Sequence, residues 1–288
     1  MSLVLGVSKG RHRTGSSRRV RVTEQFDTAA ASLEYLQAVK DSGPAGRFMR
    51  SRLRLVQDVL ADCPGGDLVD IGCGPGILTR TLLTSRPYDF RITAVDLSPS
   101  MIRRCVASAR GAGDVHAAVG NLEMLPFKDA GFDVAIATGV LEYADIRAAV
   151  EEVARVVRPG GLVVVSMLNP KSLYRLVEWF AYWRLLRIQA VIERSLGVRR
   201  EHGQKSASIR AVTPGKLCRQ LAGAGLVTVD VVHFDVTPLV PPLDRMGVFE
   251  RGNTDPAQEA RIATGWRRWL ATGYLVVARR GFPPATGH

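Results

Sequence analysis

The sequence is poor in the features that mark disulfide-rich, metal-binding and membrane-spanning proteins. Its 288 residues include four cysteines, which lie far apart and form no C-x-x-C pair, so we expect neither a disulfide framework nor a metal centre. No apolar run approaches the ~20 residues that cross a bilayer, and the apolar stretch at residues 3–7 is too short for a signal peptide. These absences favour a cytoplasmic protein with reduced thiols.

Acidic residues are also scarce relative to basic ones. The chain carries 39 lysines and arginines against 27 aspartates and glutamates, a formal net charge of +12. Six of the basic residues and none of the acids lie in residues 1–22, so the rest of the chain has a net charge of +6. We expect residues 1–22 to form a disordered basic tail. Attraction of this charge to an anionic membrane surface or to nucleic acid stays open.

Short apolar strands alternate with amphipathic helices through the middle of the chain. Because the strands are almost continuously apolar, they are typical of a parallel sheet that is covered by helices on both faces. The sequence therefore predicts a doubly wound α/β fold. We expect strands at residues 68–71, 91–96, 115–119, 132–139 and 162–167, and helices at residues 77–85, 99–110 and 145–157.

The flanking segments follow a different pattern. A helical pattern covers residues 22–60 and is interrupted at Ser42-Gly43-Pro44. Towards the C-terminus, a helix at residues 213–224 precedes strands at 226–236 and 274–279, which we expect to pair antiparallel at one sheet edge. The predicted parts are a tail at 1–22, N-terminal helices that close over the site at 23–62, a binding core at 63–169, a helical cap insertion at 170–212, and the rest of the sheet at 213–288.

The stretch LVDIGCGPG, residues 68–76, predicts a ligand-binding turn. Three alternating glycines follow an apolar strand and precede a helix, so a ligand can approach the backbone N–H groups at the helix N-terminus closely. A dinucleotide-binding G-x-G-x-x-G motif needs glycine at position 77, where Ile77 stands. The carboxylate of Asp70 would repel phosphates and attract an ammonium group. The turn therefore predicts a cationic ligand without a pyrophosphate.

A second acid defines the rest of that ligand. Asp96 ends the next predicted strand, 24 residues beyond Gly72. A carboxylate at this place can accept hydrogen bonds from both hydroxyls of a ribose. A ligand that combines a ribose with a cationic amino acid and lacks a pyrophosphate is S-adenosylmethionine, which we predict as the cofactor.

With these residues, the sequence resembles the class I S-adenosylmethionine-dependent methyltransferases. LVDIGCGPG and TAVDLSPSMI look like the first two motifs of that family. GNLEMLPFKDAGFDVAIATGVLEY and VVRPGGLVVVSM are similar to the segments around its fourth and fifth strands. The resemblance runs from about residue 26 to residue 280. It implies a Rossmann-like, mostly parallel, seven-stranded sheet with an antiparallel edge hairpin and a helical cap insertion.

The resemblance also implies which residues bind the cofactor. Asp70 and the glycine turn would line the methionine end, Asp96 would hold the ribose, and Leu97 and Met101 would flank the adenine. Asn121 stands where the family usually has an aspartate, so its bond to the adenine would lack charge assistance. The predicted cofactor residues are Asp70, Gly72, Cys73, Gly74, Gly76, Asp96, Leu97, Met101, Asn121, Leu122, Thr138 and Tyr143.

Substrate contacts are expected from segments on either side of the core. The insertion at 170–212 is rich in apolar and aromatic residues with interspersed arginines, which is typical of a cap over a pocket. Core packing, oligomer contacts or an interfacial membrane helix would use the same composition. In relatives the N-terminal helices close over the cofactor, and Phe26, Tyr35 and Arg47 are candidates here. The predicted substrate contacts are Phe26, Tyr35, Phe180 and Trp183.

A general base is needed when the methyl acceptor is a hydroxyl, an unactivated amine or a carbon acid. Tyr143, His202 and His233 are the candidate catalytic residues, and Glu142 and Asp235 are weaker ones. Each histidine has the competing interpretation of a solvated loop or surface residue. No group of these residues has the spacing of metal ligands.

The predicted activity is methyl transfer to a lipophilic small molecule, such as a polyketide, a terpenoid, a quinone or another specialised metabolite. The net charge of +12 keeps an RNA or protein methyltransferase as an alternative, although ATGVLEY stands where a base-modifying enzyme has Asn/Asp-Pro-Pro-Tyr. A methylation-triggered cyclase or a non-transferring S-adenosylmethionine-binding protein is a further alternative. We expect a homo-oligomer that binds a lipophilic small molecule and no nucleic acid, and peripheral membrane contact stays open.

Overall fold

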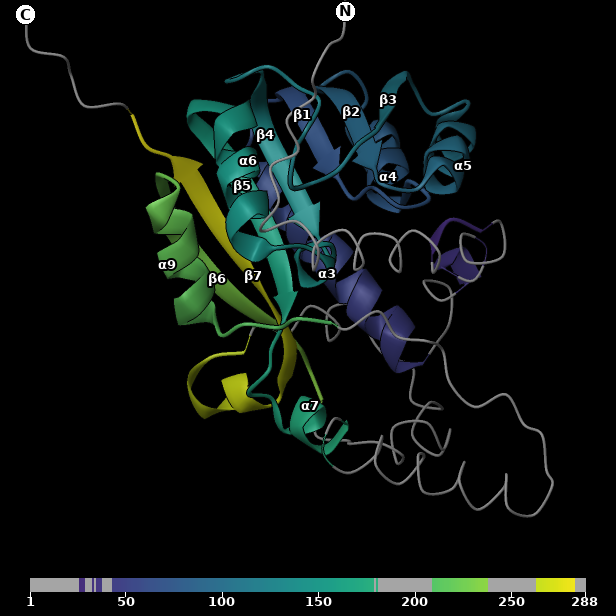
Figure 1. The fold of residues 1–288 in the computed structure, drawn as a ribbon. Helices are drawn as coiled ribbons and strands as arrows, with labels where there is room; N and C mark the ends of the chain where they lie inside the picture. The colour runs from purple at the N-terminus through teal and green to yellow at the C-terminus, as the bar shows by residue number, and fades with distance from the viewer. Residues whose placement is uncertain are drawn as a thin grey trace, which may run out of the picture.

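The computed structural model describes residues 26–28, 33, 35–37, 43–178, 180, 209–237 and 263–282. These residues form a seven-stranded sheet in the order β3-β2-β1-β4-β5-β7-β6 (Figure 1). The strands are β1 (Gly66–Ile71), β2 (Phe90–Asp96), β3 (Val115–Val119), β4 (Phe132–Thr138), β5 (Val157–Leu168), β6 (Leu226–Val236) and β7 (Ala271–Arg280). The helices are α3 (Pro44–Ala61), α4 (Ile77–Ser85), α5 (Pro99–Ala109), α6 (Ile146–Val156), α7 (Leu173–Val177) and α9 (Pro214–Gly223), with 3-10 turns η1 (Leu141–Tyr143) and η4 (Gly265–Trp269).

Strand directions confirm the predicted mixed sheet. Strand β1 pairs in parallel with β2 and β4, and the pairs β2–β3 and β4–β5 are parallel as well. Strand β7 runs antiparallel to both of its neighbours, β5 and β6. The last strand of the chain is therefore inserted between β5 and the edge strand β6.

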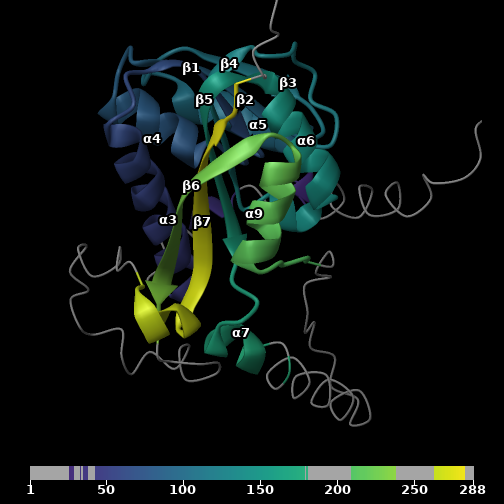
Figure 2. The same ribbon diagram turned by 90° about the vertical axis from the view of Figure 1, so that its left-hand side faces the viewer.

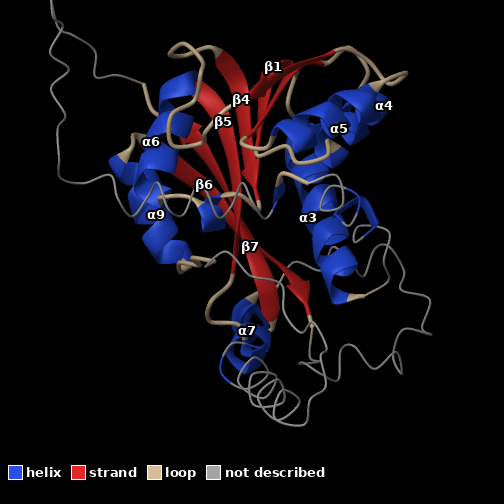
Figure 3. Ribbon diagram, turned by 45° about the vertical axis from the view of Figure 1, so that its right-hand side comes forward, coloured by secondary structure: helices blue, strands red, loops and turns tan. Residues whose placement is uncertain are grey.

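The two faces of the sheet are covered by different helices, because successive side chains of a strand point to opposite faces. In β4, Val134 and Ile136 belong to the core cluster that contains α3 and α4 residues, whereas Ala135 and Ala137 belong to the cluster that contains α6 and α9 residues. Figure 3 shows α6 and α9 on one side of the red strands and α3, α4 and α5 on the other. The doubly wound prediction is confirmed.

One predicted boundary differs from the structure. The predicted helix at residues 145–157 and strand at 162–167 leave residues 158–161 as a turn, yet α6 ends at Val156 and β5 begins directly after it at Val157. The pairing of β4 with β5 shifts register between Phe132 and Val134, and Gly160 has φ +78°. A glycine adopts positive φ without strain, so residues 158–161 form a bulge within β5 and do not form a separate turn.

Several predicted segments lie outside the described residues. These are the tail at 1–22, most of residues 23–42 and most of the insertion at 170–212. The predicted break at Ser42-Gly43-Pro44 does coincide with the start of α3, which begins at Pro44 with Gly43 as its N-cap. The predicted division into parts stays a prediction.

Candidate functional site

A cavity of about 250 Å³ opens where β1, β2 and β4 end. Open α/β sheets bind ligands at this edge, outside the carboxyl ends of their strands. A smaller cavity of about 50 Å³ shares Tyr35, Gly72 and Thr138 with it and is lined by Asp70 and Cys73. Of the predicted cofactor residues, the walls of the larger cavity contain Gly72, Gly74, Asp96, Leu97, Met101, Asn121, Leu122, Thr138 and Tyr143.

The glycine turn presents bare backbone to this cavity at one position in particular. Gly74 has φ +52°, and a Cβ added there would meet no atom within 4 Å, so its backbone faces open space. Gly76 has φ +84°, but a Cβ there would lie 2.7 Å from Cys105 Sγ of α5. Gly76 is therefore required because the turn packs closely against α5. It was predicted to contact the cofactor, but it lines neither cavity.

Asp96 is held at the cavity by the backbone of the two turns beside it. Its Oδ2 accepts a hydrogen bond from Gly74 N at 2.9 Å, and its Oδ1 accepts one from Ser98 N at 2.9 Å. Each carboxylate oxygen has two lone pairs, so both retain capacity for a ribose hydroxyl. Burial raises the pKa of Asp96, and the two backbone donors oppose that shift. The residue is thus oriented in advance for a diol.

Asp70 is a buried carboxylate beside the smaller cavity. Its Oδ2 accepts a hydrogen bond of 2.8 Å from Thr79 Oγ1, and its side chain is 3% exposed. Burial raises the pKa of Asp70 to about 6, and the Thr79 hydrogen bond acts in the opposite direction. A buried carboxylate is costly unless a cation accompanies it. The site therefore favours a ligand that brings a positive charge.

The guanidinium of Arg52 of α3 lines the same small cavity, and this residue was not among the predicted ones. Its Nη2 donates to the hydroxyl of Tyr35 at 3.2 Å, and its guanidinium lies 5.6 Å from the ring centroid of Phe48. A Cβ at Gly139 would fall 2.2 Å from Arg52 Nη1, so the arginine crosses directly over the end of β4. The available signal was Gly139 itself, since a glycine at a strand end often marks a close approach.

Two aromatic rings lie together in the wall of the larger cavity. Phe26 and Tyr143 both line it, with ring centroids 5.4 Å apart in an edge-to-face arrangement. Asp27 Oδ1 accepts hydrogen bonds from Ser100 N at 3.0 Å and Ser98 Oγ at 2.9 Å, which ties the segment carrying Phe26 to the start of α5. The predicted contacts Phe26 and Tyr35 are thereby brought to the cavity.

Tyr143 is the one candidate base that the structure, within the residues it describes, places at the cavity. Burial raises the pKa of its hydroxyl to about 12, and Glu142 adds to the shift. The hydroxyl is therefore protonated at neutral pH and is suited to donating a hydrogen bond.

The other candidate bases lie elsewhere or outside the described residues. His233 is on the edge strand β6, its ring centroid 6.0 Å from that of Tyr274, and burial lowers its pKa. Asp235 is engaged by Arg47, whose Nε donates to its Oδ1 at 2.7 Å, so this pair ties α3 to β6. Glu142 is buried and accepts from Leu168 N at 3.1 Å. His202 lies outside the described residues.

The predicted substrate contacts from the insertion are not brought to the cavity. Phe180 is 67% exposed and does not line it, and Trp183 lies outside the described residues. Arg210, which was not predicted, lies in the cavity wall, where its backbone N–H donates to Glu142 O at 3.0 Å. A cation at this place can contact an anionic or carbonyl group of a ligand.

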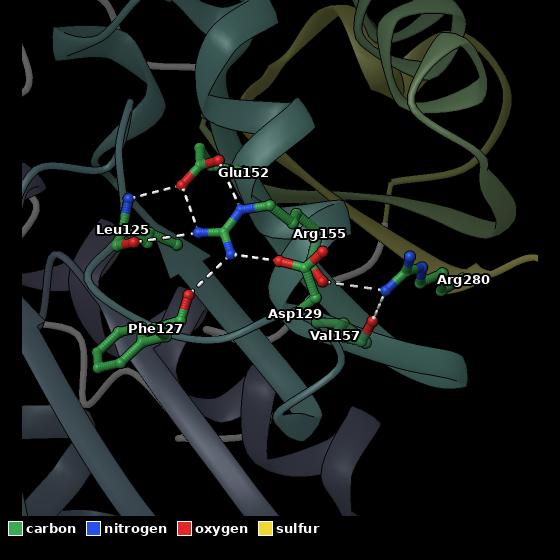
Figure 4. Close-up of polar contacts among 7 residues, drawn as sticks. All are labelled: Leu125, Phe127, Asp129, Glu152, Arg155, Val157 and Arg280. Atoms are coloured by element: carbon green, nitrogen blue, oxygen red, sulfur yellow. Dashed lines mark hydrogen bonds and ion pairs between the residues drawn. The ribbon is translucent and has the colours of Figure 1, made fainter.

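A polar clamp positions the loop that carries the adenine-side residues (Figure 4). Arg155 of α6 donates to Leu125 O at 3.0 Å, Phe127 O at 2.7 Å and Asp129 Oδ1 at 2.7 Å. Glu152 bonds the same guanidinium and also accepts from Leu125 N at 2.7 Å. The loop between β3 and β4, in which Asn121 and Leu122 lie, is thereby fastened to α6.

The open glycine turn, the acids Asp70 and Asp96 at the ends of β1 and β2, and the inserted antiparallel strand β7 are the arrangement of the class I S-adenosylmethionine-dependent methyltransferase fold. In agreement with this class, residues 69–165 match the family model of the methyltransferase domain. The chain carries that domain, and S-adenosylmethionine is its cofactor.

Known relatives cover part of the chain. A malonyl-acyl-carrier-protein O-methyltransferase of Hahella chejuensis is 34% identical over 165 residues, which is 57% of this chain and 55% of the relative. A ubiquinone/menaquinone biosynthesis C-methyltransferase (UbiE) of Geotalea daltonii is 30% identical over 149 residues, 50% of this chain and 62% of the relative. The chain thus spans a little more than half the length of these curated relatives.

Solved structures extend the likeness to most of the fold. A geranyl diphosphate C-methyltransferase from Streptomyces coelicolor has a TM-score of 0.52 and 19% sequence identity, covering 82% of this chain and 80% of that protein. At this level of identity the likeness establishes the fold alone.

Proposed function

We propose that this protein transfers a methyl group from S-adenosylmethionine to a lipophilic small molecule. The observation that carries the proposal is that the rings of Phe26, Tyr35 and Tyr143 line the same cavity as Gly74 and Asp96. Aromatic and aliphatic walls with few polar groups are typical of sites for small organic ligands. The similarity to a malonyl-acyl-carrier-protein O-methyltransferase and to a ubiquinone/menaquinone biosynthesis C-methyltransferase supports this acceptor class.

The residues present are complementary to each part of the cofactor. Asp96 would accept from the ribose hydroxyls, and the apolar side chains of Leu97, Met101 and Leu122 would enclose the adenine. Asp70 would pair with the amino group at the methionine end, and Arg52 would pair with the carboxylate. Opposite charges in a partly dry cavity attract strongly, so both ends of the amino acid would be held.

Bound S-adenosylmethionine supplies an electrophilic methyl group on a sulfonium, which an acceptor displaces in line. The protein's own contribution is alignment and exclusion of water, for which the edge-to-face pair of Phe26 and Tyr143 covers the cavity. The protonated hydroxyl of Tyr143 would orient an acceptor oxygen by donating a hydrogen bond to it. A proton released by the acceptor would pass to solvent or to the substrate's own basic group.

The proposal is tested by measuring which fraction of a lysate receives the labelled methyl group. Methyl-labelled S-adenosylmethionine is added to a lysate that contains the protein, and label is counted in the organic extract, the RNA and the protein. We expect label in the organic extract. Label confined to RNA or protein would support the macromolecular alternative, and no transfer above background would support a cyclase or a non-transferring binding protein.

Two variants serve as controls for this experiment. Asp96→Ala should lower the transferred label by about tenfold or more when the cofactor is well below saturation, because the ribose contact is lost. The second variant is Asp67→Ala. Asp67 lies at the amino end of the same strand as Asp70, and its carboxylate pairs with the exposed Arg91 at 2.7 Å. An exposed ion pair contributes about 0–1 kcal/mol to stability, so this variant should transfer label like the wild type.

A further inference from the structure

The sheet edge that holds the cavity also carries an exposed apolar and basic surface, which we call the tip patch. It consists of residues of α7, of Lys171 shortly before that helix and Phe180 shortly after it, and of residues of η4. Among them, Trp266 is 72% exposed, Trp269 55%, and Phe180 67%. The complete patch is Lys171, Leu173, Leu176, Phe180, Trp266, Arg267, Arg268 and Trp269.

The two halves of the tip patch are stapled together although they are far apart in the sequence. Asn169 Nδ2 donates to Arg268 O at 3.1 Å and to Ala271 O at 3.0 Å, and Asn169 N donates to Thr272 O at 2.9 Å. Ser172, the N-cap of α7, donates its Oγ to Asn169 O at 3.1 Å. Figures 1 and 2 both place α7 beside the yellow η4 at one end of the molecule. The patch is therefore one surface.

The charge of the tip patch has a single sign. In the η4 half, residues 263–270 contain Arg267 and Arg268 and no acid, and both arginines are exposed. In the α7 half, Glu178 is buried and pairs with Arg175 at 2.5 Å, so these two charges cancel locally. Lys171 is exposed. The described residues of this surface thus present cations among apolar side chains, with no exposed acid between them.

We propose that the tip patch docks this protein onto an anionic phospholipid bilayer. Tryptophan prefers the membrane–water interface because its ring is apolar and its N–H is polar, and leucine and phenylalanine insert beside it. Arginine and lysine at the same depth are attracted to anionic headgroups. No described helix is long and apolar enough to cross a bilayer, so the contact is with the surface.

A bilayer explains the shape of the patch better than an acidic protein does. An acidic protein partner would insert its own anchor side chains into pockets of this surface. None of the tip patch residues lines either cavity described above. The side chains instead stand out from two short elements at the end of the sheet, which suits insertion into a soft, laterally uniform surface. The proposal does not depend on the methyl acceptor.

Vesicle sedimentation with the full chain tests this docking. We expect binding to vesicles of phosphatidylglycerol and phosphatidylcholine, little binding to phosphatidylcholine alone, and loss of binding as salt rises. The double variant R267Q/R268Q should weaken binding by about thirtyfold, because two basic residues near an anionic surface together contribute about 2 kcal/mol. The double variant W266A/W269A should weaken it at least as much.

Controls separate the tip patch from charge elsewhere. R103Q/R110Q removes two exposed arginines on and just after α5, which packs beside β2 and β3 at the lateral edge of the sheet away from β6 and β7, and should bind vesicles within about twofold of the wild type. Vesicle binding that R267Q/R268Q and W266A/W269A leave unchanged would overturn the proposal and assign binding to another basic segment. No binding to anionic vesicles at low salt would overturn it in favour of a soluble acidic partner.

Discussion

The sheet joins two regions that are built from contacts of very different range. Around the cavity, Asp96 bonds Gly74 across 22 positions of sequence and Asp70 bonds Thr79 across nine. Around β5, β6 and β7, Asn169 bonds Arg268 across 99 positions and Arg47 bonds Asp235 across 188. The first region is a local motif that folds into a site, whereas the second becomes a surface only when distant segments meet.

The two regions also differ in whether their charged side chains are buried or exposed. In the cavity region the acids Asp70 and Asp96 are enclosed and their pKa values are raised by burial. In the tip patch the charged groups are Lys171, Arg267 and Arg268, which are exposed and have no exposed acid among the described patch residues. Burying a charge without a partner raises the free energy of the folded protein, and a ligand of opposite charge lowers it again. We therefore expect small-ligand binding to depend on the first region and surface association to depend on the second.

The largest expected effect is at the centre of the cavity region. Asp96→Ala removes the acceptor for the ribose and the partner of Gly74 N, and should weaken S-adenosylhomocysteine binding by about tenfold or more. Isothermal calorimetry measures this affinity, with Asp67→Ala as the matched loss of an aspartate at the other end of the sheet. Unchanged affinity in Asp96→Ala would remove the ribose assignment and with it the contrast between the regions.

The second effect is a pH dependence that Asp70 confers. Its pKa of about 6 in the free protein means that the carboxylate becomes protonated as the pH falls through that value. Because a cationic amino group needs the ionised form, cofactor affinity should fall about tenfold between pH 7.5 and pH 5. Asp70→Asn should bind more weakly at pH 7.5 and show a flatter profile. An equally steep profile in Asp70→Asn would assign the titration to another group.

The same residue predicts an opposite effect on stability. The folded-state pKa of Asp70, about 6, lies above its ordinary value of 3.8, so the fold favours the protonated form. This group leaves stability unaffected below about pH 4 and destabilises the ligand-free protein increasingly up to pH 6, by at most about 3 kcal/mol. Thermal unfolding should show Asp70→Asn to be more stable than the wild type at pH 7.5, since Asn Oδ1 can still accept from Thr79.

A smaller effect is expected where α6 clamps the adenine-side loop. Arg155→Met keeps the aliphatic stem and removes the hydrogen bonds to Leu125 O, Phe127 O and the two acids. Stability should fall by about 1–3 kcal/mol, and cofactor affinity should fall by a few-fold because the loop loosens. Chemical denaturation and calorimetry measure the two quantities. Arg147→Met on the same helix, 82% exposed, is the control and should change neither.

The smallest expected effect completes the comparison. W266A/W269A changes exposed side chains of the tip patch, so cofactor affinity and unfolding free energy should stay within about 0.5 kcal/mol of the wild type. The same calorimetric and denaturation measurements apply. A large loss of cofactor affinity in this variant would show that the two regions are one functional unit.

Residues near one another in sequence account for the predictions that the structure supports. The strand, glycine turn and helix of residues 66–85 are read directly from apolar runs and glycines, and the register of β1 against β2 then brings Asp96 to the turn. Arg52 was missed because α3 carries several arginines and only the packed helix shows which one crosses Gly139. His233 was named because a strand pattern does not say that this strand is the far edge of the sheet.

What the sequence by itself determined is the cofactor end of the site, because a turn of glycines and two acids at strand ends needs only local geometry and a parallel pairing to become a binding cavity. What only the tertiary structure decided is which distant residues join it, such as Phe26 against Tyr143 and Arg52 over Gly139, and that Asn169 unites α7 with η4 in one exposed surface. The physical reason is that long-range neighbours are set by the spatial order of the strands in the sheet, in which β7 lies between β5 and β6.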